Sequence, residues 1–144
     1  MPELSESFDV FLSTSFSSKV NYDTGAVDSE YCDYLKGILS DIRSLGMTAF
    51  CSIEYEGWKI SDEPPEVGVE VDQKAIEVSK KLLALIGSEK SDGRSDETGF
   101  ARGREIPVYL MLEPAVTGLS YYYQGLVECG RAKLISTVNE LTND

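Results

Sequence analysis

Four short, mainly apolar runs are the feature that most restricts how this chain can fold. They begin at Phe8 (FDVFLST), Met47 (MTAFCSI), Lys81 (KLLALIG) and Ile106 (IPVYLML). Each run has the length of a β-strand, and near-continuous apolarity is typical of strands that are covered on both faces of a sheet. We therefore predict a sheet that lies buried between two layers of helices.

The segments between these runs have helical spacing. Over residues 29–45, Tyr, Leu and Ile recur every three or four positions, and Gly46 follows as a stop signal. A second helix is predicted from about Pro65, where a proline is tolerated in the first turn. A short helix is predicted over residues 96–102, after a polar loop that contains glycine.

Strands that alternate with helices indicate a parallel α/β sheet with right-handed crossovers. The run AKLIS from Ala132 is a candidate fifth strand. We predict one doubly wound domain over residues 1–144, with a four- or five-stranded parallel sheet. The expected strand order is 2-1-3-4-5, as in flavodoxin-like and Rossmann-like folds.

In such a sheet, ligands bind beyond the carboxyl ends of the strands, where the strand order reverses. Here that place lies between the first and third strands, and the loops that follow the first three strands should meet there. Their side chains are hydroxyls, aromatic rings and carboxylates, which suit a polyol and a phosphate better than a metal ion. The candidate substrate-binding residues are Ser13, Thr14, Ser15, Phe16, Trp58, Ser88, Ser91, Asp92, Gly93 and Ser95.

The absence of histidine restricts the chemistry further. With no His in the chain, Ser–His–Asp and Cys–His nucleophiles and HExxH metal sites are excluded. Neither GxGxxG nor GxxxxGK[ST] occurs, so ordinary dinucleotide and P-loop sites are excluded as well. The three cysteines are widely spaced, without a CxxC pair, and we expect reduced thiols rather than disulfides or a metal site. We expect no metal and no cofactor.

The charge of the chain restricts its partners. A net charge of -12 repels nucleic-acid polymers and anionic membranes, whereas a local group of N–H donors can still bind one small phosphate. No apolar run is long enough to span a membrane. The N-terminus has no positive n-region, so a secretory signal is not expected and the cytoplasm is the default compartment.

Two carboxylates are candidates for catalysis, and each has an ordinary alternative. Glu97 is predicted in the first turn of its helix, where the helix dipole favours an acidic residue without any function. The same place beside a bound sugar would keep it ionised and nucleophilic. Asp72 lies in the helix before the third strand and is either a surface charge or a partner of Glu97. Trp58 is either an anchor for its loop or a platform for a base.

Taken together, these segments resemble the nucleoside 2-deoxyribosyltransferase superfamily, and most of all its cytidylate-type nucleoside 5′-monophosphate N-glycosidases. The resemblance runs through DVFLSTSF, DTGAV, EYEGW, DQKAIEVSKKLLALIG and SDGRSDETGFARGREIPVYLMLEP. Its most specific part is a glycine loop followed by Glu, Gly, Ala and Pro-Val. This motif is met by Gly93, Glu97, Gly99, Ala101, Pro107 and Val108.

The resemblance implies roles for particular residues. Glu97 would be the nucleophile, Asp72 would position the sugar or move a proton, and residues 91–95 would bind the sugar and its 5′ end. A neighbouring subunit would complete the site, which implies at least a homodimer. The sequence departs from the family after the first strand, where residues 13–15 are Ser-Thr-Ser instead of Gly-Gly-Pro or Ala-Gly-Pro. Ser17 stands where cytidylate hydrolases have Arg.

The expected function is hydrolysis of the N-glycosidic bond of a nucleoside 5′-monophosphate. A carboxylate nucleophile would release the free base and (deoxy)ribose 5-phosphate. A deoxyribosyltransferase shares every step up to the glycosyl-enzyme and is one alternative. The runs FDVFLS and AIEVSKKLLALIG and the loop around Trp58 also resemble TIR domains. That resemblance implies an NAD glycohydrolase or, without catalysis, an interaction module.

Overall fold

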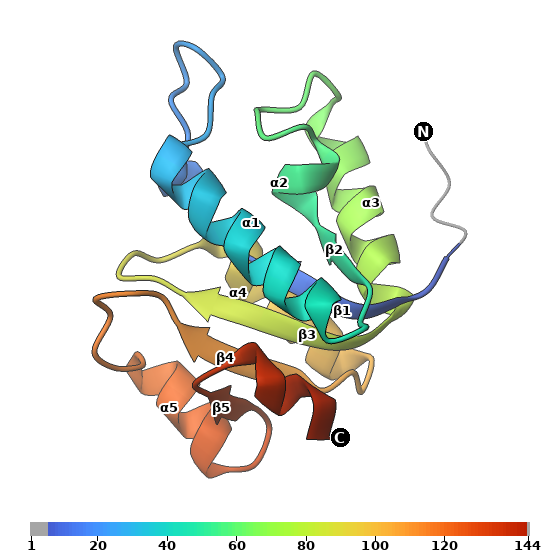
Figure 1. Ribbon diagram of the computed structural model, residues 1–144, viewed down its shortest axis with the longest axis vertical. Coiled ribbons are helices and arrows are strands. Elements are labelled where there is room, and N and C mark those ends of the chain that lie inside the picture. The colour runs from blue at the N-terminus through green and yellow to red at the C-terminus, as the bar shows by residue number, and fades with distance from the viewer. Residues whose placement is uncertain (1–5, 144) are drawn as a thin grey trace.

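The computed structural model describes residues 6–143, in which strands and helices alternate along the chain (Figure 1). The ends of the predicted domain, residues 1–5 and Asp144, lie outside the described residues, as does most of the N-terminal stretch on which the signal-peptide expectation rests. The elements are β1 (Phe8–Ser13), α1 (Ser29–Ser44), β2 (Ala49–Cys51), α2 (Ser52–Tyr55), α3 (Pro65–Glu77), β3 (Ser79–Ile86), α4 (Asp92–Gly103), β4 (Val108–Leu112), α5 (Tyr121–Glu128) and β5 (Lys133–Ile135), with short 3-10 helices at Ser17–Lys19 and Val138–Asn143.

The five strands form one parallel sheet in the order β2-β1-β3-β4-β5. This confirms the predicted order, with all five strands present. One face of the sheet packs against α1 and the C-terminal 3-10 helix, and the other packs against α3, α4 and α5. Both faces of β3 are therefore covered, which explains why the apolar run from Leu82 to Ile86 is continuous and buried.

The helix α1 follows from its own sequence. The Asp28 carboxylate accepts a hydrogen bond from the Tyr31 N–H at 3.0 Å and so caps the first turn. The predicted apolar stripe faces the sheet, where Leu35, Leu39 and Ile42 are buried. Gly46 follows the helix with a φ of 83°, a conformation that glycine adopts without strain.

Two predicted boundaries are wrong. The helix α4 begins at Asp92 rather than near residue 96, because the Ser91 side chain accepts a hydrogen bond from the Arg94 N–H and caps it. Ser, Asp and Gly resemble a loop in sequence, yet Ser and Asp are favoured at a helix N-terminus. The strand predicted from Met47 is shorter than expected, since β2 ends at Cys51 and the chain turns at once into α2.

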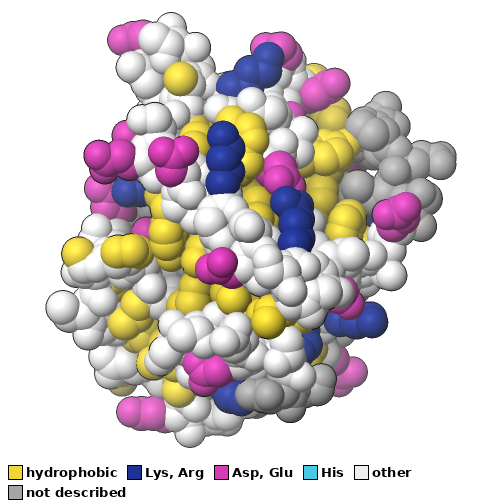
Figure 2. Space-filling model, viewed as in Figure 1, with side chains coloured by type: hydrophobic (Ala, Val, Ile, Leu, Met, Phe, Trp, Pro, Cys, Tyr) yellow, Lys and Arg dark blue, Asp and Glu magenta, His cyan; other side chains and the backbone are white. Residues whose placement is uncertain are grey.

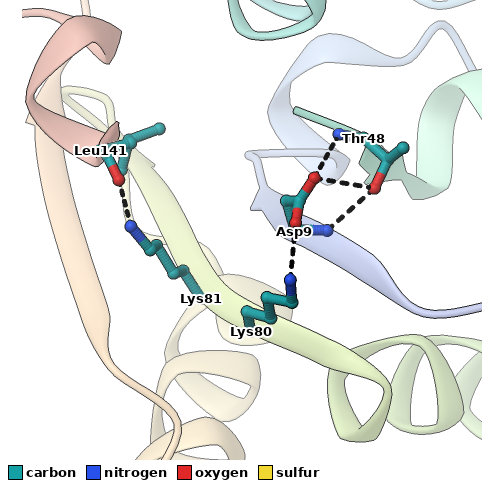
Figure 3. Close-up of polar contacts among 5 residues, drawn as sticks. All are labelled: Asp9, Thr48, Lys80, Lys81 and Leu141. Atoms are coloured by element: carbon teal, nitrogen blue, oxygen red, sulfur yellow. Dashed lines mark hydrogen bonds and ion pairs between the residues drawn. The ribbon is translucent and has the colours of Figure 1, made fainter. Parts of the chain in front are cut away.

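Polar contacts stabilise the sheet near the amino ends of β1 and β3 (Figure 3). The Asp9 carboxylate accepts a hydrogen bond from the Thr48 N–H at 2.8 Å and lies 3.3 Å from the Lys80 ammonium. The Thr48 N–H bond is the main cause that lowers the pKa of Asp9. The Lys81 ammonium donates to the carbonyl of Leu141 and so joins β3 to the C-terminal segment. These contacts lie near the amino ends of β1 and β3, opposite the edge at which ligands are expected.

The surface agrees with the acidic composition. Acidic side chains are scattered over the face shown in Figure 2 and do not gather in one patch. Within residues 6–143, no helix is both long and apolar enough to cross a bilayer.

Candidate active site

A cavity of about 400 Å³ opens at the carboxyl ends of β1 and β2. Its walls come from five places in the chain: the segment after β1, the helix α2, the loop after α2, the helix α3 and the first two turns of α4. The lining residues are Leu12, Thr14, Phe16, Ser17, Ser52, Ile53, Glu56, Lys59, Ile60, Ser61, Glu63, Pro65, Gly68, Asp72, Ser91, Gly93 and Glu97. This is the place that the switch-point rule predicts.

Backbone pairing holds one wall of the cavity. The segment from Val20 to Val27 folds back on itself through a bridge between these two residues. A second bridge joins Ala26 to Lys59, and the Ile60 N–H donates to the carbonyl of Gly25 at 2.9 Å. The turn before α1 thus supports the loop after α2, whose residues Lys59 and Ile60 line the cavity.

Two carboxylates face this cavity from neighbouring helices. Glu97 comes from the second turn of α4, and Asp72 comes from the middle of α3. A serine hydroxyl at the end of a strand holds each of them. Ser13 donates to Glu97 Oε1 at 2.7 Å, and Ser52 donates to Asp72 Oδ1 at 2.5 Å. Sheet and helices therefore fix both carboxyl groups before any ligand binds.

The two carboxyl groups do not ionise independently. Burial and, after it, the negative charge of Asp72 raise the pKa of Glu97 to about 8, although the hydrogen bond from the Ser13 hydroxyl acts against both. Burial also raises the pKa of Asp72, while its hydrogen bond to Ser52 acts against that change. Because the pKa of Glu97 is raised above neutrality, the pair retains a proton at pH 7.

Such a pair can divide two chemical tasks. The ionised member can attack an electrophilic carbon, and the protonated member can donate to a leaving group, as in retaining glycosidases. The predicted first-turn position of Glu97 is wrong, since α4 begins at Asp92 and Glu97 lies in the second turn. The helix dipole is weak there, so burial and Asp72 govern its ionisation instead.

The structure brings together six of the twelve residues predicted for the site. Thr14, Phe16, Asp72, Ser91, Gly93 and Glu97 all line the cavity. Ser13 lies beneath it and touches Glu97. The remaining five lie elsewhere: Ser15 is buried beside Arg94, Trp58 packs against the core, and Ser88, Asp92 and Ser95 are exposed.

Trp58 acts as an anchor for its loop. It has a φ of 65°, and its ring packs against the core on the side of α1, with the Lys36 ammonium 4.9 Å from the ring centre. It does not line the cavity. Of the two aromatic residues predicted to flank a base, only Phe16 is in place to do so.

Several lining residues were missed from the sequence. Ser52 could have been found, because it directly follows the second strand, where the switch-point rule applies. Lys59 and Glu63 lie in a polar loop with no distinguishing pattern. Among the described residues, no group of three or more Cys, Asp or Glu side chains is arranged to hold a metal ion.

Several solved structures share this fold, and three of them are compared below. A 2-deoxyribosyltransferase from Bacillus psychrosaccharolyticus superposes with a TM-score of 0.64 and 17% identity, over 94% of this chain and 90% of that one. BlsM superposes with a TM-score of 0.73 and 23% identity, over 90% and 80% of the two chains. The CMP N-glycosidase BcmB from Clostridium botulinum superposes with a TM-score of 0.60 and 16% identity, over 88% and 86%.

These likenesses concern the fold. The chain has the architecture of a 2-deoxyribosyltransferase and of a CMP N-glycosidase across nearly its whole length, which supports the resemblance seen in the sequence. No protein-family model and no curated protein sequence matches the chain.

Proposed function

We propose that this protein hydrolyses the N-glycosidic bond of a nucleoside 5′-monophosphate and releases the free base and (deoxy)ribose 5-phosphate. The observation that carries this proposal is the pair formed by Glu97 and Asp72, which faces one cavity from two neighbouring helices. Burial raises the pKa of both carboxyl groups, so the pair retains a proton at neutral pH. The shared fold with two enzymes of N-glycosidic chemistry supports it.

The reaction requires that one carboxyl group of the pair is ionised while the other carries the proton. In the reacting form Asp72 carries the proton and the Glu97 carboxylate attacks C1′ of the sugar. The bond from C1′ to the base nitrogen breaks, its electron pair leaves with the base, and Asp72 gives the base its proton. Water then attacks C1′ and frees Glu97, while its proton restores Asp72. The sum is nucleotide plus water giving base plus sugar phosphate.

Other lining residues suit the rest of the substrate. Ser91 and Gly93 lie at the start of α4, whose backbone N–H groups point toward the cavity end of the helix and favour an anion such as a 5′-phosphate. Phe16, Ile53 and Ile60 offer apolar surface to a base. The Ser13 hydroxyl stabilises ionised Glu97, which is the form that attacks.

A second candidate function rests on the charge of the cavity. Glu56, Glu63, Asp72 and Glu97 line it together with a single basic residue, Lys59. Such a lining favours a base that is cationic before it leaves, as nicotinamide is in NAD, and it opposes a dianionic phosphate. An NAD glycohydrolase is therefore the enzymatic alternative. A deoxyribosyltransferase differs only in the acceptor that attacks the glycosyl-enzyme.

One panel experiment tests these possibilities. The protein is incubated with nucleoside monophosphates, deoxynucleosides and NAD, and the free base is measured by chromatography. Glu97→Gln and Asp72→Asn should lose release of base, and Glu128→Gln, which changes an exposed carboxylate on α5, should retain it. No base from any substrate would refute glycosidic cleavage. Release of nicotinamide alone would favour the NAD glycohydrolase, and release only with a second base present would favour the transferase.

We also propose that the protein assembles as a homodimer. Tyr121 and Tyr122 expose 92% and 66% of their surface on α5, whereas Tyr123 is buried, and exposed tyrosines are enriched in interfaces. Light scattering coupled to size exclusion should give twice the chain mass for the protein and a smaller mass for the double substitution of Tyr121 and Tyr122 by Ser. A monomer at every concentration would refute this assembly.

A further inference from the structure

A buried arginine lies directly beside the candidate site. Arg94 is the third residue of α4, and only 3% of its surface is exposed. It does not line the cavity. Its guanidinium reaches from α4 to the carboxyl edge of the sheet. There Nη1 donates to Ser15 Oγ at 2.8 Å and to the Leu85 carbonyl at 3.1 Å, and Nη2 donates to the Glu89 carbonyl at 3.1 Å.

The chemistry of this burial is unusual. Every acceptor of the Arg94 guanidinium is an uncharged oxygen, and its Nε has no hydrogen-bond partner among the described residues. A buried charge without an opposite charge beside it costs stability. A shorter or apolar side chain would fill the same place at less cost, so a gain elsewhere is needed to explain the arginine.

The acceptors show where that gain lies. Ser15 belongs to the segment after β1, Leu85 lies near the end of β3, and Glu89 lies in the loop that leads into α4. Arg94 thus ties α4 to three segments at the carboxyl edge of the sheet, and one of them, the segment after β1, lines the cavity. Its contacts do not extend to the amino end of the sheet.

The segment after β1 is also held from the other side. The Ser15 N–H donates to Tyr31 Oη at 3.2 Å, and Tyr31 Oη donates to Glu113 Oε2 at 2.8 Å. A Cβ on Gly87 would lie 2.7 Å from Glu113 Oε1, so this carboxylate packs directly against the backbone. Ser15 therefore sits between α1 and α4 with both its backbone N–H and its side chain engaged.

The end of β1 and the helix α4 are joined a second time, at Glu97. Ser13 Oγ donates to Glu97 Oε1 at 2.7 Å, two residues before Ser15 and three residues after Arg94. The Arg94–Ser15 contact consequently determines how the end of β1 stands relative to α4, and that relation sets the Ser13–Glu97 contact. The same contact fixes the positions of Thr14 and Phe16, which line the cavity.

We propose that Arg94 is a positioning residue for the carboxylate chemistry, acting through Ser15 to hold the segment 13–16 against α4. This inference rests on the proposed function. Arg94 does not line the cavity and makes no hydrogen bond to Glu97, so its effect is geometric. It keeps Ser13 within hydrogen-bonding distance of Glu97 and holds Phe16 in place.

The test compares Arg94→Met, Arg94→Lys and Ser15→Ala with Arg104→Met as a matched control. Arg104 is an exposed arginine at the C-cap of the same helix, and it pairs with Glu77 at 3.0 Å. A misplacement of about 1 Å at a reacting group costs up to about 100-fold in rate. We expect Arg94→Met to lower kcat by roughly 10- to 100-fold with KM changed by less than about 3-fold. Lys should restore part of the loss, since it offers one donor to Ser15.

Two further results separate positioning from general stability. Ser15→Ala should lower kcat in the same way, and the double variant with Arg94→Met should be no slower than the worse single variant, because both changes remove one contact. Arg104→Met should retain the kcat of the unaltered protein. Additive losses, or an unchanged kcat in Arg94→Met, would overturn the proposal.

A measurement without substrate keeps this proposal distinct from the proposed function. Amide hydrogen exchange should show faster exchange at residues 13–16 in Arg94→Met, with protection in β4 and α5 unchanged. If the unaltered protein releases no base from any substrate, the proposed function fails, and local loss of protection still supports the structural part of the inference. Loss of protection spread over all five strands would overturn it.

Discussion

Replacing Glu97 with Gln should remove activity and at the same time stabilise the protein at neutral and alkaline pH. Burial and the charge of Asp72 raise the pKa of Glu97 from 4.5 to about 8. One unit of pKa difference between folded and unfolded states corresponds to about 1.4 kcal/mol, so the shift gives an upper limit of about 5 kcal/mol. Glu97 is half-buried and open to the cavity, where water screens its charge, and we expect about 2–3 kcal/mol.

The sign of the pH dependence follows from proton binding. Between pH 4.5 and about 8, the folded protein keeps a proton on Glu97 that the unfolded chain has released. The free energy of unfolding therefore falls as the pH rises through this window, and the full loss is reached above the folded pKa. Gln cannot ionise, so the variant escapes this loss.

Urea unfolding followed by far-UV circular dichroism measures the effect. The free energy of unfolding of Glu97→Gln minus that of the unaltered protein should be smallest near the unfolded pKa, and it should grow by about 2–3 kcal/mol on going to alkaline pH. Glu128→Gln, at an exposed position on α5, should show no such growth. A difference that stays constant with pH would refute the conclusion that burial and Asp72 oppose ionisation of Glu97.

Three further substitutions have distinct expected outcomes. Ser13→Ala removes the hydroxyl that favours ionised Glu97, so we expect the pH midpoint of activity to move upward and kcat to fall by roughly 10-fold, as measured by base release across pH. Gly87→Ala places a Cβ 2.7 Å from Glu113 Oε1, and we expect a loss of about 1–3 kcal/mol in urea unfolding; unchanged stability would show that Glu113 can move aside. Trp58→Phe should leave KM within about 2-fold, because the ring lies outside the cavity; a large rise in KM would place Trp58 on the substrate.

The fold could be predicted because its signals are local. The apolar run from Lys81 has strand length and no polar face, which is sufficient to place it in the middle of a covered sheet. The spacing over 29–45 determines which side of α1 is buried. Once strands and helices alternate, handedness and crossover rules leave few sheet orders. The start of α4 was missed because capping by Ser91 depends on the position of one side chain, which composition does not reveal.

The candidate site was predictable in part. The sequence brought Glu97, Asp72 and the segment after β1 to the same edge, because the carboxyl ends of parallel strands share an edge. It could not show which of the three adjacent hydroxyl side chains, those of Ser13, Thr14 and Ser15, touches Glu97. Ser13 does so as the last residue of β1, whereas Ser15 turns toward Arg94 and away from the cavity. Side chains alternate between the two faces of the sheet only within a strand. The direction of the side chains that follow β1 therefore depends on their contacts with other segments.

The sequence by itself determined the class of fold, the strand order and the absence of imidazole chemistry, since each of these follows from residue types and their spacing. Only the tertiary structure decided that burial and Asp72 raise the pKa of Glu97, that the Trp58 ring packs against the core, and that Arg94 is buried beside Ser15. The physical reason is that ionisation and orientation depend on what surrounds a side chain. Those surroundings come from segments far apart in the chain, which meet only after folding.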